Sequence, residues 1–297
     1  MNRMFVPPYR ISLSGGGIKG FAHIGALEVL EAKDLLKTVR EYVGVSAGAF
    51  CALGMCIGCS IPEMRELVMR MDFQSIQHID PETVLNFPET YGIDNGLNLE
   101  KLLAAVLKAK HVAPNITFAQ LEAMRIGPNL RVFATNITKC IPQEFSAALT
   151  PDIEVCLAVR ASMSVPIYFT PVKIFGTGDL FLDGGIANPS PFPHLKYSEQ
   201  IHTLAIVFGD DHKQAGNIDN IYDFLYQVYY SLDYLDVVRF KSKWAANTIK
   251  IQCGRVNSIE FGAGLELKNR LINAGRCAAE EFLKSPGQRP VRRFSVA

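Results

Sequence analysis

This sequence has little net charge, lacks the cysteine pattern of a disulfide-bonded protein and shows no evident export signal. Its 30 lysines and arginines nearly balance 29 aspartates and glutamates, which leaves a formal charge of +1 over 297 residues. Nucleic-acid binding needs concentrated positive charge, so we expect no nucleic-acid partner. The seven cysteines are odd in number and three lie in one apolar segment, unlike the disulfide framework of a secreted domain. This cysteine usage predicts a reducing compartment.

Two segments bear on export and on membranes. The apolar run at residues 4–6 stops at Pro7, too short for the core of a signal peptide, so we expect an intracellular protein, cytoplasmic or bound peripherally to a membrane. Residues 43–62 carry no charge over twenty positions, which is the length of a membrane span. A strand, a tight turn and a buried helix would give the same composition. We favour the buried helix, because the segment contains the polar Ser46 in a glycine-rich turn.

The overall composition supports a large core, since 48% of the residues are apolar and 20% are charged. Apolar periodicity alternates between strands and helices, which predicts an α/β fold with a mainly parallel central sheet flanked by helices. We expect one catalytic domain over residues 1–284 and a disordered basic tail at 285–297. The expected strands are 9–13, 42–45, 130–137, 171–175, 180–182 and 201–208, the expected helices are 21–37, 47–59 and 151–160, and capping boxes at 60–63 and 117–120 begin two more.

Residues 15–20, Gly-Gly-Gly-Ile-Lys-Gly, form a glycine-rich loop between an expected strand and an expected helix. The loop matches the Gly-x-Gly-x-x-Gly pattern of dinucleotide sites, but the second strand ends in Val45 and Ser46 and lacks the acidic residue that such a site needs. The glycines could also serve only to form a turn. We favour a third interpretation, in which bare backbone N–H groups stabilise an oxyanion.

Ser46 lies at the centre of residues 44–48, a Gly-x-Ser-x-Gly turn between an expected strand and an apolar helix. Such a turn, called a nucleophile elbow, exposes a serine hydroxyl at a tight strand-to-helix bend. In an α/β-hydrolase an acidic residue and a histidine would follow the serine and complete a triad. His194, His202 and His212 are the histidines late enough in the chain, and none lies in a supporting motif.

Three motifs in this order make the sequence resemble the patatin-like phospholipases. Residues 15–20 resemble the glycine-rich oxyanion loop of that family, residues 44–48 its nucleophile elbow, and Asp183 with the two glycines after it the Asp-Gly-Gly or Asp-Gly-Ala signature. Lys19 stands where many members have arginine. The resemblance spans most of residues 9–190. It is also carried by residues 23–27, 161–166 and 188–189.

This resemblance implies a serine–aspartate dyad that works without a histidine. Ser46 would be the nucleophile and Asp183 its base, with no cofactor and no metal, calcium included. The implied activity is that of a phospholipase A, which cleaves carboxylic esters of phospholipids or related lipids and contacts the membrane peripherally. On its own, Asp183 could equally form a turn before two glycines. The implied oxyanion-hole residues are Gly15, Gly16, Gly17 and Lys19, and the implied motif glycines are Gly20, Gly44, Gly48, Gly184 and Gly185.

Three other activities are compatible with the same residues. An α/β-hydrolase esterase would use a Ser-Asp-His triad, a lipid acyltransferase would pass the acyl group to another alcohol, and an inactive relative would only bind lipid. We favour the lipid acyl hydrolase, because the three motifs are intact and occur in order.

Three further segments allow a structural and a functional interpretation. Cys51, Cys56 and Cys59 have the spacing of a plant-type iron–sulfur cluster, but a helix would point them apart, so we expect core packing. From Ile218 onward, apolar residues at helical spacing and several tyrosines predict a helix that packs in the core or at a subunit contact, with docking on lipid as the alternative. Residues 292–295 resemble a phosphorylation site for a basophilic kinase, and the basic residues could also favour anionic membrane. We expect instead a solvated tail without either function.

Overall fold

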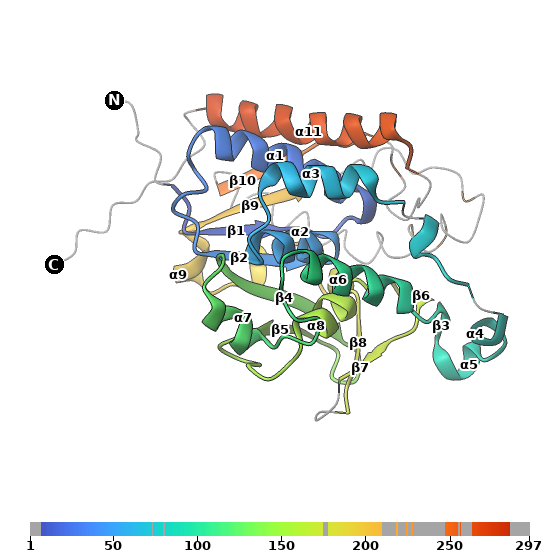
Figure 1. Cartoon of the computed structure of the whole chain (residues 1–297). Coiled ribbons are helices and arrows are strands. Elements are labelled where there is room, and N and C mark those ends of the chain that lie inside the picture. The colour runs from blue at the N-terminus through green and yellow to red at the C-terminus, as the bar shows by residue number, and fades with distance from the viewer. Residues whose placement is uncertain are drawn as a thin grey trace.

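The computed structural model describes residues 7–209 except 73, 80 and 175–177, residues 247–256 except 255, residues 263–285, and the single positions 218, 224 and 227. These residues form one α/β unit in which helices flank an eight-stranded, mainly parallel sheet (Figure 1). The predicted fold class is therefore confirmed. The predictions for the helix from Ile218 onward, for His212 and for the tail beyond residue 285 lie outside the described residues.

The described strands are β1 (Arg10–Leu13), β2 (Glu41–Val45), β3 (Gly92–Asp94), β4 (Asn129–Asn136), β5 (Ile141–Ser146), β6 (Ile167–Phe169), β7 (Val172–Lys173), β8 (Leu180–Leu182), β9 (Thr203–Phe208) and β10 (Thr248–Ile251). The central sheet has the order β10-β9-β1-β2-β4-β8-β7, and β5 also pairs with β4. The neighbours from β10 to β4 are parallel, whereas β5, β8 and β7 join antiparallel. A separate parallel pair joins β3 to β6. The parallel strands bring their carboxyl ends to one edge, where ligands bind in open α/β sheets.

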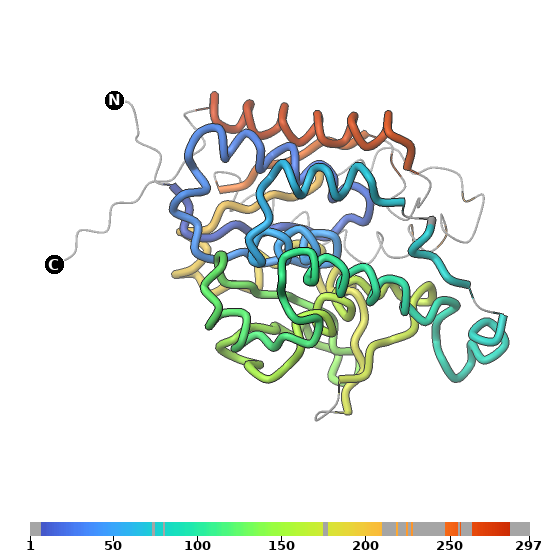
Figure 2. Tube along the Cα trace, viewed as in Figure 1, coloured from blue at the N-terminus to red at the C-terminus, as the bar shows by residue number. Residues whose placement is uncertain are grey.

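The described helices are α1 (Phe21–Ala32), α2 (Ala47–Cys56), α3 (Ile61–Arg70), α4 (Pro81–Leu85), α5 (Phe87–Thr90), α6 (Leu97–Ala109), α7 (Phe118–Met124), α8 (Val155–Ser162), α9 (Tyr197–Gln200) and α11 (Leu265–Lys284), with short 3-10 turns η1 (Gly17–Gly20), η2 (Gln74–Ile76), η3 (Gly184–Ile186) and η4 (Phe192–His194). Helices α1 and α11 come from opposite ends of the chain and lie side by side (Figure 2). Glycines permit this contact, since a Cβ on Gly25 would lie 1.8 Å from the Ile272 carbonyl oxygen and one on Gly275 would lie 1.9 Å from that of Ala22. Helix α11 also packs on β10, so the pair is joined to the edge of the sheet.

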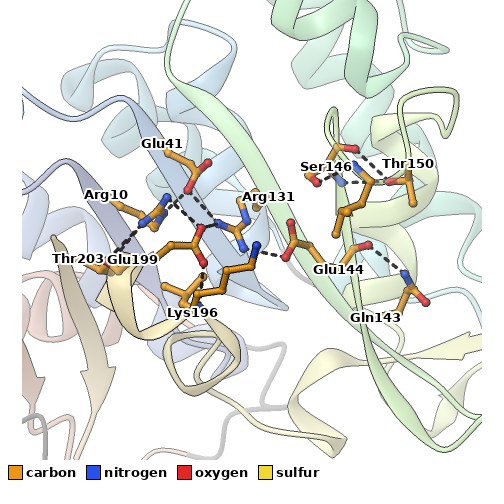
Figure 3. A network of polar contacts seen from close by, with 12 residues as sticks. Arg10, Glu41, Arg131, Gln143, Glu144, Ser146, Thr150, Lys196, Glu199 and Thr203 are labelled. Atoms are coloured by element: carbon orange, nitrogen blue, oxygen red, sulfur yellow. Dashed lines mark hydrogen bonds and ion pairs between the residues drawn. The ribbon is translucent and has the colours of Figure 1, made fainter. Parts of the chain in front are cut away.

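The amino ends of the strands carry a network of buried charges, drawn in Figure 3. Arg131 of β4 donates to Glu144 and Glu199 at 2.7 Å each and to Glu41 at 3.2 Å, and Arg10 of β1 pairs with Glu41 and Glu199. Burial opposes the charge of Arg131, but hydrogen bonds and attraction from these carboxylates outweigh it and raise the pKa of the guanidinium. The network therefore joins β1, β2, β4, β5 and α9 at the end of the sheet opposite to the carboxyl ends.

Most predicted strands agree with the structure within two residues, and both predicted capping boxes are present, at Ser60 before α3 and at Thr117 before α7. Three helix predictions were wrong at their ends. Helix α1 ends at Ala32 and not at residue 37, because the chain turns through Asp34 with φ 58°. Helix α2 ends at Cys56 because Gly58, with φ 80°, closes it. Helix α8 begins at Val155 and not at residue 151.

The uncharged segment at residues 43–62 is divided between the end of β2, the ten-residue helix α2 and the start of α3. Within the described ranges, none of the helices has the length and apolar character needed to cross a membrane. The favoured interpretation of this segment, a strand followed by a buried helix, is therefore confirmed.

Candidate active site

Ser46 forms the bend between β2 and α2 and has φ 53° and ψ −124°. A residue other than glycine rarely adopts this conformation, which costs on the order of 1–3 kcal/mol and persists only where the surroundings hold it. The Ser46 carbonyl oxygen accepts hydrogen bonds from the N–H groups of Ala49 and Phe50, which begins helix α2. A Cβ on Gly48 would lie 2.3 Å from the Leu13 carbonyl oxygen, so only glycine lets the helix approach β1 here. These are the features of the predicted nucleophile elbow.

Asp183 reaches Ser46 because two strands share one edge of β4. Strand β2 pairs with β4 as far as Phe133, and β8 pairs with it from Thr135. Strand β5 pairs with β4 across residues 131–136. Since a strand has two edges, β2 and β8 occupy the same edge one after the other and run toward each other. Ser46, which follows β2, and Asp183, which follows β8, therefore meet where the two strands end.

The two side chains are joined by a short hydrogen bond in a buried position. The Ser46 hydroxyl donates to Oδ2 of Asp183 at 2.6 Å, and the Gly185 N–H donates to Oδ1 at 2.8 Å. Asp183 is 1% exposed and Ser46 is 8% exposed. The Thr135 hydroxyl also donates to the Asp183 carbonyl oxygen at 2.8 Å. A carboxylate held in this way can orient a serine hydroxyl and accept its proton.

The glycine-rich loop lies directly beside Ser46. A Cβ on Gly15 would be 3.1 Å from the Cβ of Ser46, and the loop continues into η1 and α1. Gly17 has φ 54°, a left-handed conformation that favours glycine. The Lys19 side chain is 3% exposed, so it lies inside the protein and not at the mouth of the site.

The four predicted oxyanion-hole residues differ in what their N–H groups do. The Gly15 N–H donates to the Pro189 carbonyl oxygen at 2.7 Å, and the Lys19 N–H donates to that of Gly16 at 3.1 Å. The N–H groups of Gly16 and Gly17 have no acceptor within the described part of the chain. Of the four, Gly16 and Gly17 therefore have donors that a substrate oxygen can use.

The histidines proposed for a triad occupy other positions. The His194 ring stacks on Phe133 with 5.4 Å between centroids, and the exposed His202 precedes β9, where its carbonyl oxygen accepts from Arg10. The single proton of the Ser46 hydroxyl goes to a carboxylate, where a triad would place a histidine nitrogen. This geometry favours the dyad interpretation.

His23 lies in α1, after the glycine loop, and its only signal in the sequence is the resemblance at residues 23–27. Its Nε2 donates to the Ser14 carbonyl oxygen at 2.9 Å, and its ring packs against Phe208 with 4.7 Å between centroids. Burial lowers the pKa of the imidazole to about 4, although the hydrogen bond to Ser14 opposes this shift. The ring is therefore neutral at physiological pH and helps to hold the end of β1.

Three further residues contact the dyad's backbone or support the turn that does, and the sequence analysis assigned them no role. Ser162 is the last residue of α8, Ser164 lies in the turn that follows, and the buried Arg160 lies in α8, one helical turn before Ser164. The resemblance at residues 161–166 was the only signal for the two serines, and Arg160 had none, because a serine or an arginine in a helix indicates no function by itself.

The cysteines of α2 are core residues. Burial raises the pKa of the Cys51 thiol to about 12 and raises that of Cys56 well above its ordinary value, so both stay protonated. In the portion of the chain that the structure covers, no three histidine, cysteine, aspartate or glutamate side chains gather as metal ligands. This favours core packing over an iron–sulfur cluster.

Comparison with known proteins decides the family. A model of the patatin-like phospholipase family matches residues 11–196, more than half of the chain. The chain belongs to the patatin-like phospholipase family. The matched range contains the glycine loop, Ser46 and Asp183, so the resemblance seen in the sequence is confirmed. Family membership supports a lipid hydrolase activity.

Several relatives are similar over long stretches. An uncharacterized protein of Acanthamoeba polyphaga mimivirus is 27% identical over 276 residues, 89% of this chain and 90% of that protein. The uncharacterized protein YqhO of Bacillus subtilis is 28% identical over 292 residues, 91% of this chain and 96% of that protein. A probable lipid hydrolase of invertebrate iridescent virus 6 is 29% identical over 187 residues, 60% of each chain.

Two solved structures share the fold. VipD from Legionella pneumophila superposes with a TM-score of 0.60 at 18% identity, over 94% of this chain and 67% of that one. The type III effector ExoU of Pseudomonas aeruginosa superposes with a TM-score of 0.55 at 19% identity, over 94% of this chain and 53% of that one. These likenesses support the patatin-like fold.

Proposed function

We propose that the protein is a calcium-independent lipid acyl hydrolase of the phospholipase A type, which cleaves carboxylic esters of phospholipids through Ser46 and Asp183. The observation that carries this proposal is the 2.6 Å hydrogen bond from the Ser46 hydroxyl to the buried Asp183 carboxylate at a strained nucleophile elbow. The family supports a lipid substrate. The dyad supplies the nucleophile and the base that ester hydrolysis requires.

The reaction proceeds in two halves. In the first, the Ser46 oxygen forms a bond to the ester carbonyl carbon while its proton moves to Asp183, and the carbonyl oxygen becomes an oxyanion that accepts hydrogen bonds from the Gly16 and Gly17 N–H groups. The carbon–oxygen bond to the leaving alcohol then breaks, and Asp183 returns the proton to that alcohol. An acyl ester on Ser46 remains.

The second half repeats these steps with water. Asp183 takes a proton from a water molecule whose oxygen attacks the acyl carbon, and the bond to Ser46 breaks as the proton returns to the serine oxygen. A free fatty acid leaves and the enzyme is restored. Because a carboxylate is a weak base for an alcohol or for water, the rate depends on how well the oxyanion donors and the Ser46–Asp183 pair are held before reaction.

The decisive experiment is covalent labelling of the full chain with a fluorophosphonate probe. Wild type should be labelled and Ser46→Ala should not, whereas His194→Ala and His202→Ala should be labelled as wild type. Product analysis by mass spectrometry with a defined phosphatidylcholine, in the presence of EDTA, should give lysophospholipid and free fatty acid in equal amounts. Labelling that persists in Ser46→Ala, an essential histidine, or activity lost in EDTA would contradict the proposal. Acyl transfer to an added alcohol without free fatty acid would indicate an acyltransferase instead.

We also propose a peripheral membrane contact on the segment from α4 to α6, where large apolar side chains are exposed. Leu85 is 81% exposed, Tyr91 57% and Leu97 49%. This segment is anchored through β3 to β6, which begins three residues after Ser164. Exposed apolar side chains near a lipid-cleaving site suit an interface, because inserting them in the bilayer removes them from water.

Leu85→Ser with Tyr91→Ser should reduce co-sedimentation with phosphatidylcholine vesicles and leave cleavage of a soluble short-chain ester unchanged. Unaltered co-sedimentation would contradict the contact.

A further inference from the structure

The end of α8 and the turn that follows it hold the main chain of both dyad residues. The Ser46 N–H donates to the Ser162 hydroxyl at 2.8 Å, and the Asp183 N–H donates to the Ser164 carbonyl oxygen at 2.8 Å. The two dyad residues are 137 positions apart, whereas these acceptors lie two positions apart, at the end of α8 and in the turn after it. The turn therefore sets where the ends of β2 and β8 lie relative to each other.

The Ser162 hydroxyl both accepts and donates at this point. It accepts from the Ser46 N–H and donates to the Phe133 carbonyl oxygen at 2.6 Å, and its side chain is completely buried. Phe133 is the last β4 residue that pairs with β2. The Ser162 hydroxyl thus bridges Ser46, the residue after β2, to Phe133 of β4, one residue beyond the last pair that joins the two strands. Because the position is completely buried, water does not supply these hydrogen bonds in place of the hydroxyl. Only a side chain that both donates and accepts satisfies the Ser46 N–H and the Phe133 carbonyl oxygen.

The strain at Ser46 explains why this contact matters for the reaction. Its backbone conformation is unfavourable for serine, so it needs support on both sides. On the carbonyl side the start of α2 supplies that support. On the N–H side the support is Ser162. Without this hydrogen bond the peptide group before Ser46 can rotate, and the Ser46 hydroxyl no longer points at Asp183.

From this geometry we infer that Ser162 is a positioning residue, which holds Ser46 in the orientation that keeps its hydroxyl on Asp183 and itself touches no substrate. The inference rests on the proposed function, since it assigns a role within the Ser46–Asp183 dyad.

Arg160 in turn fixes the shape of the turn. Its side chain is 1% exposed, and its guanidinium donates to the Ser164 hydroxyl, to the Asn95 carbonyl oxygen at 3.2 Å and to the Thr170 carbonyl oxygen at 3.5 Å. It also lies over the Phe169 ring, with 4.9 Å to the centroid. Burial lowers the pKa of Arg160 to about 10, and the group remains charged at neutral pH. The turn is therefore tied to β6 and to the loop before α6.

The test uses three substitutions at one position, with a soluble p-nitrophenyl ester as substrate. Ser162→Ala removes both hydrogen bonds and should lower kcat about 10- to 100-fold at unchanged KM, with the rate of fluorophosphonate labelling falling by the same factor. Ser162→Cys fills the same space with a weak donor and acceptor and should lose nearly as much. Ser162→Thr keeps the hydroxyl and should restore kcat to within about 5-fold of wild type.

The matched control is Ser146→Ala, which removes another buried hydroxyl, one that accepts from the Leu149 N–H at 3.3 Å between β5 and α8. It should leave kcat unchanged. If Ser162→Ala does not fold, the Cys and Thr variants still decide the matter. Wild-type kcat in Ser162→Cys, or equally slow turnover in folded Cys and Thr variants, would overturn the positioning role alone. Labelling that survives in Ser46→Ala would instead overturn the proposed function.

Discussion

The two ends of the central sheet bury polar groups for different purposes. At the amino ends of the strands, Arg10 and Arg131 share three glutamates in a network of ion pairs. At the carboxyl ends, Ser46 and Asp183 meet through one short hydrogen bond, and Ser46 has an unfavourable backbone conformation. The first arrangement joins strands, and the second holds the serine that we propose as the nucleophile. Stability and reactivity are therefore separated along the length of the same strands, and substitutions at either end should affect mainly one of them.

The largest expected effect is at the carboxyl end. Asp183→Asn replaces the proton acceptor with an amide that cannot take a proton, so kcat should fall at least about 1,000-fold. The amide oxygen can still accept from the Gly185 N–H while the amide NH2 donates to the Ser46 oxygen, so the free energy of unfolding should change by no more than about 1 kcal/mol. Steady-state kinetics and urea unfolding measure both quantities. Substantial remaining activity would show that Asp183 is not the base.

The opposite result is expected at the amino end. Arg131→Met leaves the Glu144 carboxylate without an arginine, and leaves Glu41 and Glu199 with Arg10 alone. It should lower the free energy of unfolding by about 3–5 kcal/mol, while kcat of the folded enzyme stays within about 2-fold of wild type. The control is Arg70→Met, which breaks a 2.7 Å ion pair with Glu66 whose arginine side chain is 81% exposed, and it should cost less than about 1 kcal/mol. If Arg131→Met lowered the free energy of unfolding no more than Arg70→Met does, the buried network would not stabilise the fold more than a surface ion pair. The contrast between the two ends of the sheet would then be removed.

His23 of α1, which donates to the Ser14 carbonyl oxygen just after β1, should make stability depend on pH. Its pKa is about 4 in the folded protein and about 6.5 when unfolded, so between these values the unfolded chain binds a proton that the folded protein does not. The contribution of His23 to stability should therefore decrease by up to about 3 kcal/mol as pH falls from 6.5 to 4, and this contribution changes no further below 4. His23→Gln should remove this decrease in urea unfolding measured from pH 7 to pH 4. His202→Gln, the same change at an exposed histidine, should leave this decrease in stability as it is in wild type.

The smallest expected effect lies away from both ends. The Ser60 hydroxyl accepts from the Glu63 N–H at 3.3 Å, and the Glu63 carboxylate accepts from the Ser60 N–H at 2.7 Å, before helix α3. Ser60→Ala should lower the free energy of unfolding by about 1 kcal/mol and leave kcat unchanged. Thr117→Ala, at the corresponding box before α7, should do the same. A loss of activity in either variant would mean that the site depends on more of the fold than the carboxyl end.

Much of the fold could be predicted from the sequence, because central parallel strands are apolar on both faces and strand β9 gives a continuous apolar run. The ends of α1 and α2 could not, since they depend on single left-handed residues at Asp34 and Gly58. Strand β5 gave no signal because it begins with exposed residues and lacks apolar alternation. In the site, Ser46 and the glycine loop were predicted from local motifs. Asp183 was found by resemblance, and Ser162 was not found.

The sequence by itself determined the local backbone of the site. A Gly-x-Ser-x-Gly turn after a strand and a run of three glycines restrict the chain within a few residues, so the elbow at Ser46 and the adjacent loop follow from neighbouring residues alone. Tertiary structure alone decided the rest. Which group receives the Ser46 proton depends on β2 and β8 sharing one edge of β4, and which glycine N–H groups remain available depends on the carbonyl oxygens packed against the loop. The resulting hydrogen bonds, from Ser46 to Asp183 and from Gly15 to Pro189, join residues more than a hundred positions apart, and no local pattern encodes such a distance.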